Sequence, residues 1–222
     1  MITAMAGVAL SIATAPAISA RDVPPAMRGL AGVYDGSQME MGVGLRLQPN
    51  GRFDYQLAYG ALDESASGTW TRDRDLVFLT SDPVTPPKFS LIDQRPATDG
   101  KMHVALDLPT GWSRQYFDAE LELSDGRAAG GQMSDDSDVI ELGPGDRPVS
   151  LRLVMGVYAL RSDAFPIGGA GPSVVRVRFD PNDIGKVAFA GTPLHIVGRT
   201  LTFERYGRSI VFRRTNQRWE TD

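Results

Sequence analysis

The chain has 222 residues, of which 42% are hydrophobic and 23% are charged, with a formal net charge of −4. These proportions are ordinary for a globular protein and exclude a wholly disordered chain. The absence of cysteine excludes disulfides, thiolate metal sites and a cysteine nucleophile. The acidic balance disfavours nucleic acid as a partner.

The first twenty residues carry no charged side chain, and Arg21 and Asp22 follow directly. An apolar run that ends in small residues, here Ala17 or Ala20, is typical of a secretory signal peptide and its cleavage site. We therefore predict a signal peptide over residues 1–20 and an exported protein, periplasmic or extracellular. A retained membrane anchor is the alternative, although the segment is barely long enough to cross a bilayer. We expect no membrane span in the mature chain.

Beyond residue 25 the sequence alternates between apolar and polar residues almost throughout. Such alternation is typical of half-buried β-strands, because successive side chains point to opposite faces. Segments 43–47 and 53–57 flank Pro49-Asn50-Gly51, which predicts a hairpin with a tight turn. No window shows a sustained helical period, so the predicted fold class is all-β, an antiparallel barrel or sandwich. Further strands are expected at 67–71, 76–79, 89–92, 102–106, 116–123, 149–155 and 175–179, with a terminal hairpin at 201–203 and 210–212.

The stretch from Leu108 to Gly111 is the best candidate for a boundary between two modules. It predicts a first β module over residues 21–108 and a second over 109–222, with one continuous domain as the alternative. Gly32-Val33-Tyr34 recurs as Gly156-Val157-Tyr158, and each is followed by an alternating strand. This echo indicates two copies of one module, or it reflects the residues that any hairpin protein uses.

Three local motifs follow one another in the first part of the chain. They are Gly32-Val33-Tyr34, the hairpin Leu45-x-Leu47 to Asn50-Gly51-x-Phe53, and Gly68-Thr69-Trp70. In this combination residues 32–80 resemble small exported lipocalin-like barrels. The resemblance implies a ligand-holding or lipid-related role without catalysis, and it assigns no binding residues. In that family Gly-x-Trp lies at the start of the barrel, whereas here it lies well inside the chain.

Residues that commonly catalyse reactions are sparse in this sequence. His103 and His195 lie in short strands, and we interpret both as surface residues; no Gly-x-Ser-x-Gly elbow accompanies them. Asp54, Asp63 and Glu64 are carboxylates of the kind that a glycosidase uses in pairs. The expected function is a non-catalytic binding or structural role without a cofactor. The alternatives are a hydrolase acting on an envelope polymer through paired carboxylates and an assembly protein that pairs through an edge strand.

The acidic segment Asp135-Asp136-Ser137-Asp138 concentrates carboxylates in one predicted loop. Ca²⁺ takes six to eight oxygen ligands, but the segment lacks the twelve-residue pattern of an EF-hand. We therefore predict a solvated loop without a metal ion.

Charge is distributed unevenly along the chain. Residues 113–146 hold nine acids against two arginines, a net charge of −7, whereas residues 174–218 have a net charge of +6. The guanidinium fork suits phosphate and carboxylate groups. Pairing with the acidic region is the alternative to a free basic surface. The predicted basic surface, for an anionic envelope lipid or polysaccharide, consists of Arg176, Arg178, Arg205 and Arg208.

Overall fold

The computed structural model describes residues 29–169 and 171–219, so the predicted signal peptide over residues 1–20 lies outside the described residues. The predicted fold class is confirmed, because 57% of the structure is strand and 3% is helical. The two short helices are the 3₁₀ turns η1 (Arg114–Tyr116) and η2 (Gly156–Tyr158). Among the described residues, no helix has the length and apolar character needed to cross a membrane.

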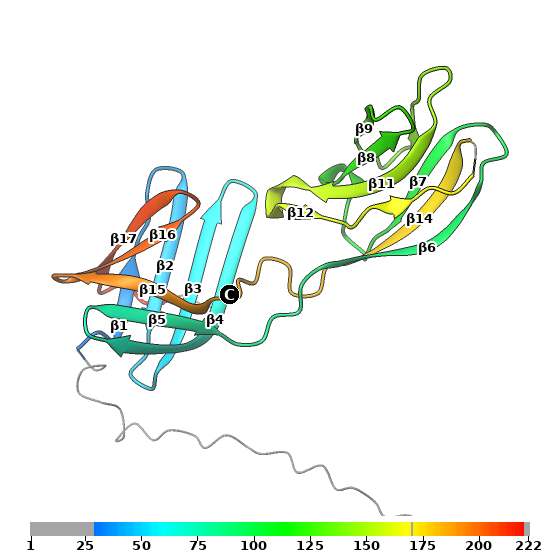
Figure 1. The fold of residues 1–222 in the computed structure, drawn as a ribbon. Helices are drawn as coiled ribbons and strands as arrows, with labels where there is room; N and C mark the ends of the chain where they lie inside the picture. Colours follow the sequence, from blue (N-terminus) through cyan, green and yellow to red (C-terminus); the bar gives the residue numbers. More distant parts are fainter. Residues whose placement is uncertain (1–28, 170, 220–222) are drawn as a thin grey trace, which may run out of the picture.

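Eight strands close into an antiparallel barrel, which occupies the left half of Figure 1. Each strand pairs with the next barrel strand along the chain, and β17 closes the barrel against β1. This is the order of an up-and-down barrel, interrupted once between β5 and β15. The barrel strands are β1 (Gly32–Asp35), β2 (Met41–Leu47), β3 (Arg52–Tyr59), β4 (Leu62–Asp73), β5 (Leu76–Ser81), β15 (Ala190–Val197), β16 (Thr200–Arg205) and β17 (Arg208–Thr215).

Local sequence accounts for the hairpins of the barrel. The predicted hairpin of β2 and β3 is confirmed, with Leu45 paired to Tyr55 and with Gly51 at a φ of 80° in the turn. A positive φ is open to glycine at no steric cost, which is why this turn is tight. The predicted terminal hairpin of β16 and β17 is also confirmed.

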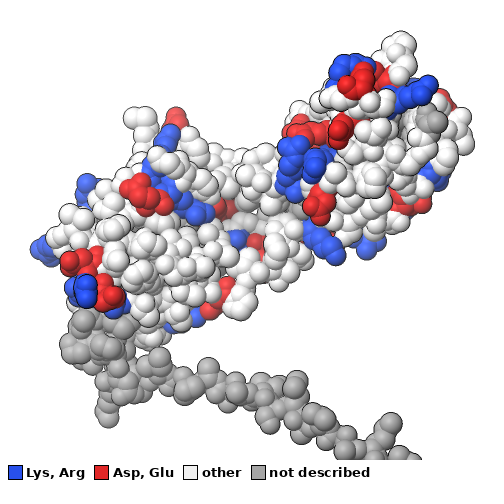
Figure 2. Space-filling view, viewed as in Figure 1, with Lys and Arg blue, Asp and Glu red and all other residues white. Residues whose placement is uncertain are grey.

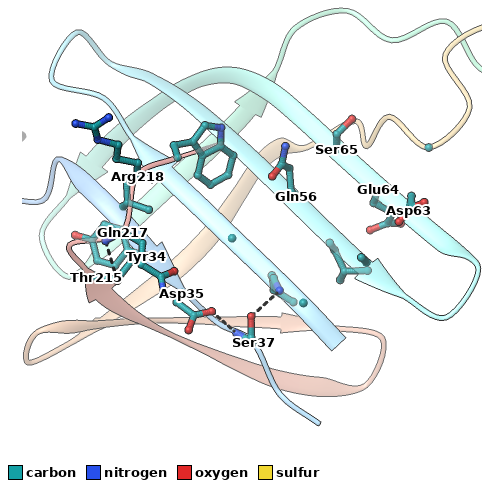
Figure 3. A pocket seen from close by; sticks show the side chains of 18 of the residues that line it. Tyr34, Asp35, Ser37, Gln56, Asp63, Glu64, Ser65, Thr215, Gln217 and Arg218 are labelled. Atoms are coloured by element: carbon teal, nitrogen blue, oxygen red, sulfur yellow. Dashed lines mark hydrogen bonds between the residues drawn. The ribbon is translucent and has the colours of Figure 1, made fainter. Parts of the chain in front are cut away.

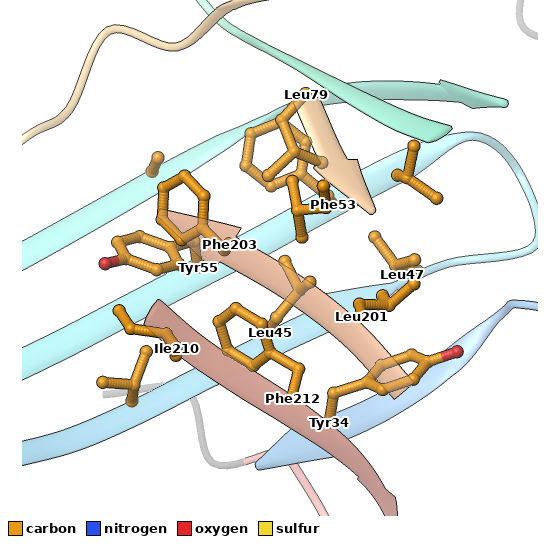
Figure 4. Close-up of a cluster of buried hydrophobic side chains, with 14 of the residues drawn as sticks. Tyr34, Leu45, Leu47, Phe53, Tyr55, Leu79, Leu201, Phe203, Ile210 and Phe212 are labelled. Carbon is orange, nitrogen blue, oxygen red and sulfur yellow. The ribbon is translucent and has the colours of Figure 1, made fainter. Parts of the chain in front are cut away.

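The interior of the barrel is filled by side chains (Figure 4). An eight-stranded barrel is just wide enough either to be filled by its own side chains or to hold one small ligand. Here aromatic rings occupy the space: Tyr55 and Phe203 both pack edge-on against Phe189, at centroid distances of 5.3 and 5.8 Å. The inward residues that are at most 1% exposed include Leu45, Leu47, Phe53, Tyr55, Trp70, Val77, Leu79, Leu194, Leu201, Ile210 and Phe212.

The strands between β5 and β15 form a separate sandwich, on the right of Figure 1. One sheet has the order β10-β7-β14-β6, in which β14 runs parallel to β7, and the other has the order β12-β11-β8-β9 with β13 beside β11. A second apolar core, centred on Phe117, Leu153 and Val177, lies between the two sheets. The strands are β6 (Lys88–Pro96), β7 (Met102–Asp107), β8 (Asp118–Leu123), β9 (Ala128–Gln132), β10 (Val139–Ile140), β11 (Pro148–Met155), β12 (Leu160–Arg161), β13 (Phe165–Pro166) and β14 (Ser173–Asp180).

The sheet topology therefore divides the chain at other places than the expected modules 21–108 and 109–222. The barrel takes its strands from both ends of the chain, and the sandwich is inserted between them. Residue 108 lies after β7, inside the insertion. The sequence echo is not a structural repeat, since Gly32-Val33-Tyr34 belongs to β1 whereas Gly156-Val157-Tyr158 forms η2.

Two connecting segments, residues 82–87 and 181–189, join the barrel to the inserted sandwich. They are tied to each other where Thr85 and Asp183 exchange hydrogen bonds of 2.9 and 3.1 Å. The second segment also lies along β4, where the Ser65 N–H donates to the Gly185 carbonyl and the Val187 N–H donates to the Ser65 carbonyl, both at 2.8 Å. We call these two connecting segments the neck. Its second segment covers the part of β4 that extends beyond the pairing of β4 with β5.

Candidate outer groove of the barrel

A hollow of about 980 Å³ lies on the outer surface of the barrel, across β1 to β4 (Figure 3). Its floor includes Gly42 and Gly44, the outward positions of β2 between the buried Met41, Val43 and Leu45. Outward residues normally cover a strand, but glycine has no side chain and leaves its backbone open. The two glycines, together with Ala58 on β3, therefore make a trough. We call this hollow the outer groove.

Polar side chains cross the floor of the outer groove in one row. Strand register aligns Asp35 with Gly44, Gly44 with Gln56, and Gln56 with Ser65. A parallel row aligns Gly42 with Ala58 and Ala58 with Asp63. Neighbouring strands lie about 4.8 Å apart. The first row spans β1 to β4 and the second spans β2 to β4, with a glycine at the β2 position of both. The outer groove is thus suited to an extended ligand with a short repeat.

One wall of the outer groove is the C-terminal segment, which includes Arg218 and Trp219. The Trp219 ring lies 3.0 Å from the position that a Cβ atom on Gly44 would occupy, so the glycine permits the indole to lie on the sheet. The Arg46 guanidinium is 5.5 Å from the centroid of the Trp219 ring, within the range of a cation–π contact.

The opposite wall comes from the neck and the inserted sandwich, through Tyr158, Ile184 and Gly185. Gly185 has a φ of 79°, and a Cβ atom there would lie 2.8 Å from the Asp63 carbonyl oxygen. Only a residue without a side chain can approach β4 this closely. The outer groove is therefore built from the barrel, the neck and the sandwich together.

The outer groove is lined by acidic side chains from β1 and β4 and by Arg218 of the C-terminal segment. Asp35 accepts a 2.9 Å hydrogen bond from the Ser37 backbone N–H, and hydrogen bonding by Ser37 lowers the pKa of the Asp35 carboxyl. Asp63 is exposed on the outward side of β4. These two acidic side chains attract hydrogen-bond donors and disfavour strongly anionic ligands.

Glu64 lines the same hollow but turns toward the mouth of the barrel, where it meets Arg205. The guanidinium Nη2 lies 2.7 Å from Glu64 Oε2, and the two side chains are only 18% and 9% exposed. The Tyr206 hydroxyl also donates to Glu64, while the buried Tyr55 hydroxyl beside them makes no hydrogen bond. Burial is the largest cause that raises the pKa of Tyr206 to about 12. We call Tyr55, Glu64, Arg205 and Tyr206 the mouth cluster.

The predicted basic surface is divided between two parts of the fold. Arg176 and Arg178 point outward from β14, as expected, because Val175 and Val177 are at most 1% exposed. They lie in the sandwich, where Arg176 Nε contacts Asp107 at 2.9 Å. Arg205 and Arg208 lie in the barrel, and Arg205 is held in the mouth cluster. The residues are therefore not brought together on one sheet.

Arg208 packs near the Tyr59 ring at 6.0 Å. On the face of the molecule shown in Figure 2, basic and acidic side chains are interspersed over both lobes. The long basic stretch of the sequence does not form a single basic field on this face, because its strands belong to different sheets. Binding of an anionic ligand by these arginines stays a prediction.

The three candidate carboxylates of a hydrolase do not face one another as a pair. Asp54 accepts hydrogen bonds from Arg46 at 2.8 Å and from Gln48 at 2.9 Å. Glu64 forms an ion pair with Arg205. Of these three carboxylates, Asp63 faces the outer groove and has no ion pair among the described residues. Gly42, Gly44 and Trp219 line the outer groove but are not among the predicted site residues. Two outward glycines in one strand are a signal for Gly42 and Gly44, whereas the sequence carries none for Trp219.

The acidic loop is tied to the protein by its own carboxylates. Asp135 accepts from the Ser113 hydroxyl at 2.6 Å and from the Arg114 backbone N–H at 2.8 Å. Asp138 lies 3.0 Å from the His103 ring. Within the described part of the chain, no group of three or more histidine, aspartate or glutamate side chains has the arrangement needed to hold a metal ion.

No protein-family model, curated protein or solved structure matches this chain. The outer groove is therefore interpreted from its own geometry.

Proposed function

We propose that the protein is an exported, non-catalytic binding protein that holds a neutral polysaccharide of the cell envelope in the outer groove of a lipocalin-like barrel. The observation that carries the proposal is the glycine-floored trough, with one row of polar groups crossing it and an aromatic ring in each wall. Ligand sites are typically concave, with a few polar groups that fix orientation.

The chemistry of a sugar chain fits these walls and rows. A pyranose ring has C–H faces that pack on aromatic rings such as Trp219 and Tyr158. Its hydroxyl groups donate to carboxylates and exchange hydrogen bonds with amides and hydroxyls, as Asp35, Gln56 and Ser65 provide. A lipid tail would require an apolar cavity, but the barrel interior is filled. The acidic side chains of Asp35 and Asp63 favour a neutral chain over an anionic one.

Hydrolysis by paired carboxylates is less well supported by this geometry. A glycosidase needs one carboxyl group with a raised pKa as the general acid and a second carboxylate facing the same sugar. In the outer groove the pKa of Asp35 is lowered, and Glu64 is held in an ion pair.

Filling the trough tests the proposal directly. The Gly42→Leu variant should fold normally, because a Cβ atom there meets nothing within 4 Å and strands favour larger residues over glycine. Its leucine side chain would occupy the floor, so we expect affinity to fall by at least about tenfold, or 1.4 kcal/mol. Calorimetric titration with chitotetraose, cellotetraose and the acidic tetragalacturonate measures this affinity. We expect the acidic oligomer to bind most weakly.

Ala128→Leu is the matched control, since it places the same leucine side chain at an exposed strand position of the sandwich. It should bind as the unaltered protein does. The proposal is wrong if none of the three oligosaccharides binds, or if Gly42→Leu binds them as well as the control. Binding to phosphatidylglycerol vesicles alone would favour the lipid alternative.

Removing the aromatic wall should weaken the same interaction. Trp219→Ala is expected to reduce oligosaccharide affinity by up to about tenfold, the range of one aromatic contact. Tyr116→Ala, which removes an aromatic ring that is 53% exposed on the sandwich, should have no effect. Equal affinities of the two variants in the same titration would remove Trp219 from the site.

A further inference from the structure

His103 lies on β7 between two carboxylates that come from different segments. Its Nδ1 atom is 3.0 Å from Asp138 Oδ1, and its Nε2 atom is 2.9 Å from Asp99 Oδ2. The imidazole side chain is 19% exposed, so water has limited access to it. We call these three residues the carboxylate–histidine clasp.

The geometry itself requires a charged ring. Ionised carboxylates only accept hydrogen bonds, whereas a neutral imidazole carries a single N–H. Both contacts can therefore be hydrogen bonds only when both ring nitrogens are protonated. Loss of one proton must turn one contact into a lone pair facing a carboxylate.

Few other charged groups lie close to the imidazole ring of His103. Lys101 donates its backbone N–H to Asp99 at 3.0 Å, within the same turn. On the neighbouring strand β14, the residue opposite His103 in the strand register is the uncharged Val174. The nearby Arg176 forms an ion pair with Asp107. Hydrogen bonding by Asp138, and then by Asp99, raises the pKa of His103 above its usual value.

The clasp holds two segments that border a second hollow, of about 450 Å³, in the sandwich. Asp99 lies in the turn between β6 and β7, and Asp138 comes directly before β10. Strand β10 is only two residues long, and besides its pairing with β7 it is held by the Val104 N–H, which donates to the Asp138 carbonyl at 2.7 Å. Residues 100–102 and 139–147 line the hollow together with Gly171 and Pro172, so the clasp joins two segments of its wall.

We propose that the carboxylate–histidine clasp is a pH-sensitive fastener that keeps residues 134–147 docked on β7 while His103 is protonated, and lets this wall of the second hollow loosen when the ring loses its proton. The direction of this pH effect follows from the protonation of His103 in the folded state. Because the pKa is raised on folding, the stabilisation is fully present below about 6.5, the usual pKa of histidine, and is lost as the pH rises through the folded value.

Amide hydrogen exchange of the full chain across pH 5 to 9, corrected for intrinsic rates, tests this fastener. Protection of the Val104 N–H and of peptides covering 134–147 should fall roughly tenfold as the pH rises, as expected for one lost charge-assisted hydrogen bond. Strands β8 and β11 should keep their protection over the same range. NMR titration of the His103 imidazole should show it losing its proton above the usual pKa of histidine, about 6.5.

Three variants separate the clasp from a general effect of pH. His103→Gln should make protection of 134–147 independent of pH and low throughout, whereas His195→Gln should change nothing. Asp99→Asn removes one half of the clasp and should move the pH transition downward, which keeps the test available if His103→Gln folds poorly. A pH-independent protection of 134–147 in the unaltered protein, or a His103 that titrates at or below the usual histidine pKa of about 6.5, would overturn the proposal.

Discussion

Replacing Gly68 with alanine should destabilise the protein by about 3 kcal/mol, at the upper end for forcing extra bulk into a packed core. Gly68 faces the barrel interior on β4, and a Cβ atom there would lie 2.1 Å from the Thr80 carbonyl oxygen and 2.7 Å from the Ser81 Cα. These are backbone atoms of β5, so they cannot move away without breaking the pairing of β4 with β5. Urea unfolding measures the effect.

Gly42→Ala is the matched control for this substitution. It also replaces a strand glycine of the barrel, but its Cβ atom meets open space. We expect it to be neutral or to stabilise slightly, because glycine costs the most backbone entropy on folding. Equal unfolding midpoints for Gly68→Ala and Gly42→Ala would show that the close approach to β5 does not constrain the barrel.

Replacing Arg205 with methionine should cost about 3 kcal/mol of the free energy of unfolding, because it leaves Glu64 nearly buried without its partner. Arg205 contacts both Glu64 oxygens, at 2.7 and 2.8 Å, across the mouth of the barrel. Combining Arg205→Met with Glu64→Leu removes both charges and should recover most of that loss. Urea unfolding of both single variants and the double variant gives the coupling energy.

The exposed pair of Arg161 and Glu120 provides the comparison, since its side chains are 56% and 43% exposed. Exposed pairs contribute up to about 1 kcal/mol, so Arg161→Met should have a small effect. Additive effects of the Glu64 and Arg205 substitutions would mean that the ion pair does not couple the two sides of the barrel.

The outer groove was only partly readable from the chain. Gly42 and Gly44 are visible as outward glycines in an alternating strand, and Asp63 was singled out as a carboxylate. Trp219 gave no signal, because its place on Gly44 depends on where the chain goes after β17. Tyr158 reaches the same hollow from the inserted sandwich, far from β2 in sequence.

Charge was the least reliable guide to the site. Arg205 was predicted to belong to a surface, but it is held by Glu64, 141 residues earlier in the chain. His103 was interpreted as an ordinary surface residue, but one of its two carboxylate partners is 35 residues away. Ion pairs depend on which strands meet, and the linear order of charges carries little of that information.

Alternation and turn residues in the sequence predict the longer strands of this protein and its tight hairpins, but not the short strands β1, β9, β10, β12 and β13. The predicted features depend on a two-residue period and on turn residues such as Gly51, which act within a few positions of the chain. The pairing of β5 with β15 across the whole inserted sandwich is a property of the three-dimensional fold. That pairing joins the strand Leu76–Ser81 to Ala190–Val197 and has no local signature. Closure of the barrel satisfies the backbone hydrogen bonds of its edge strands, a requirement of the whole sheet that no single segment reveals.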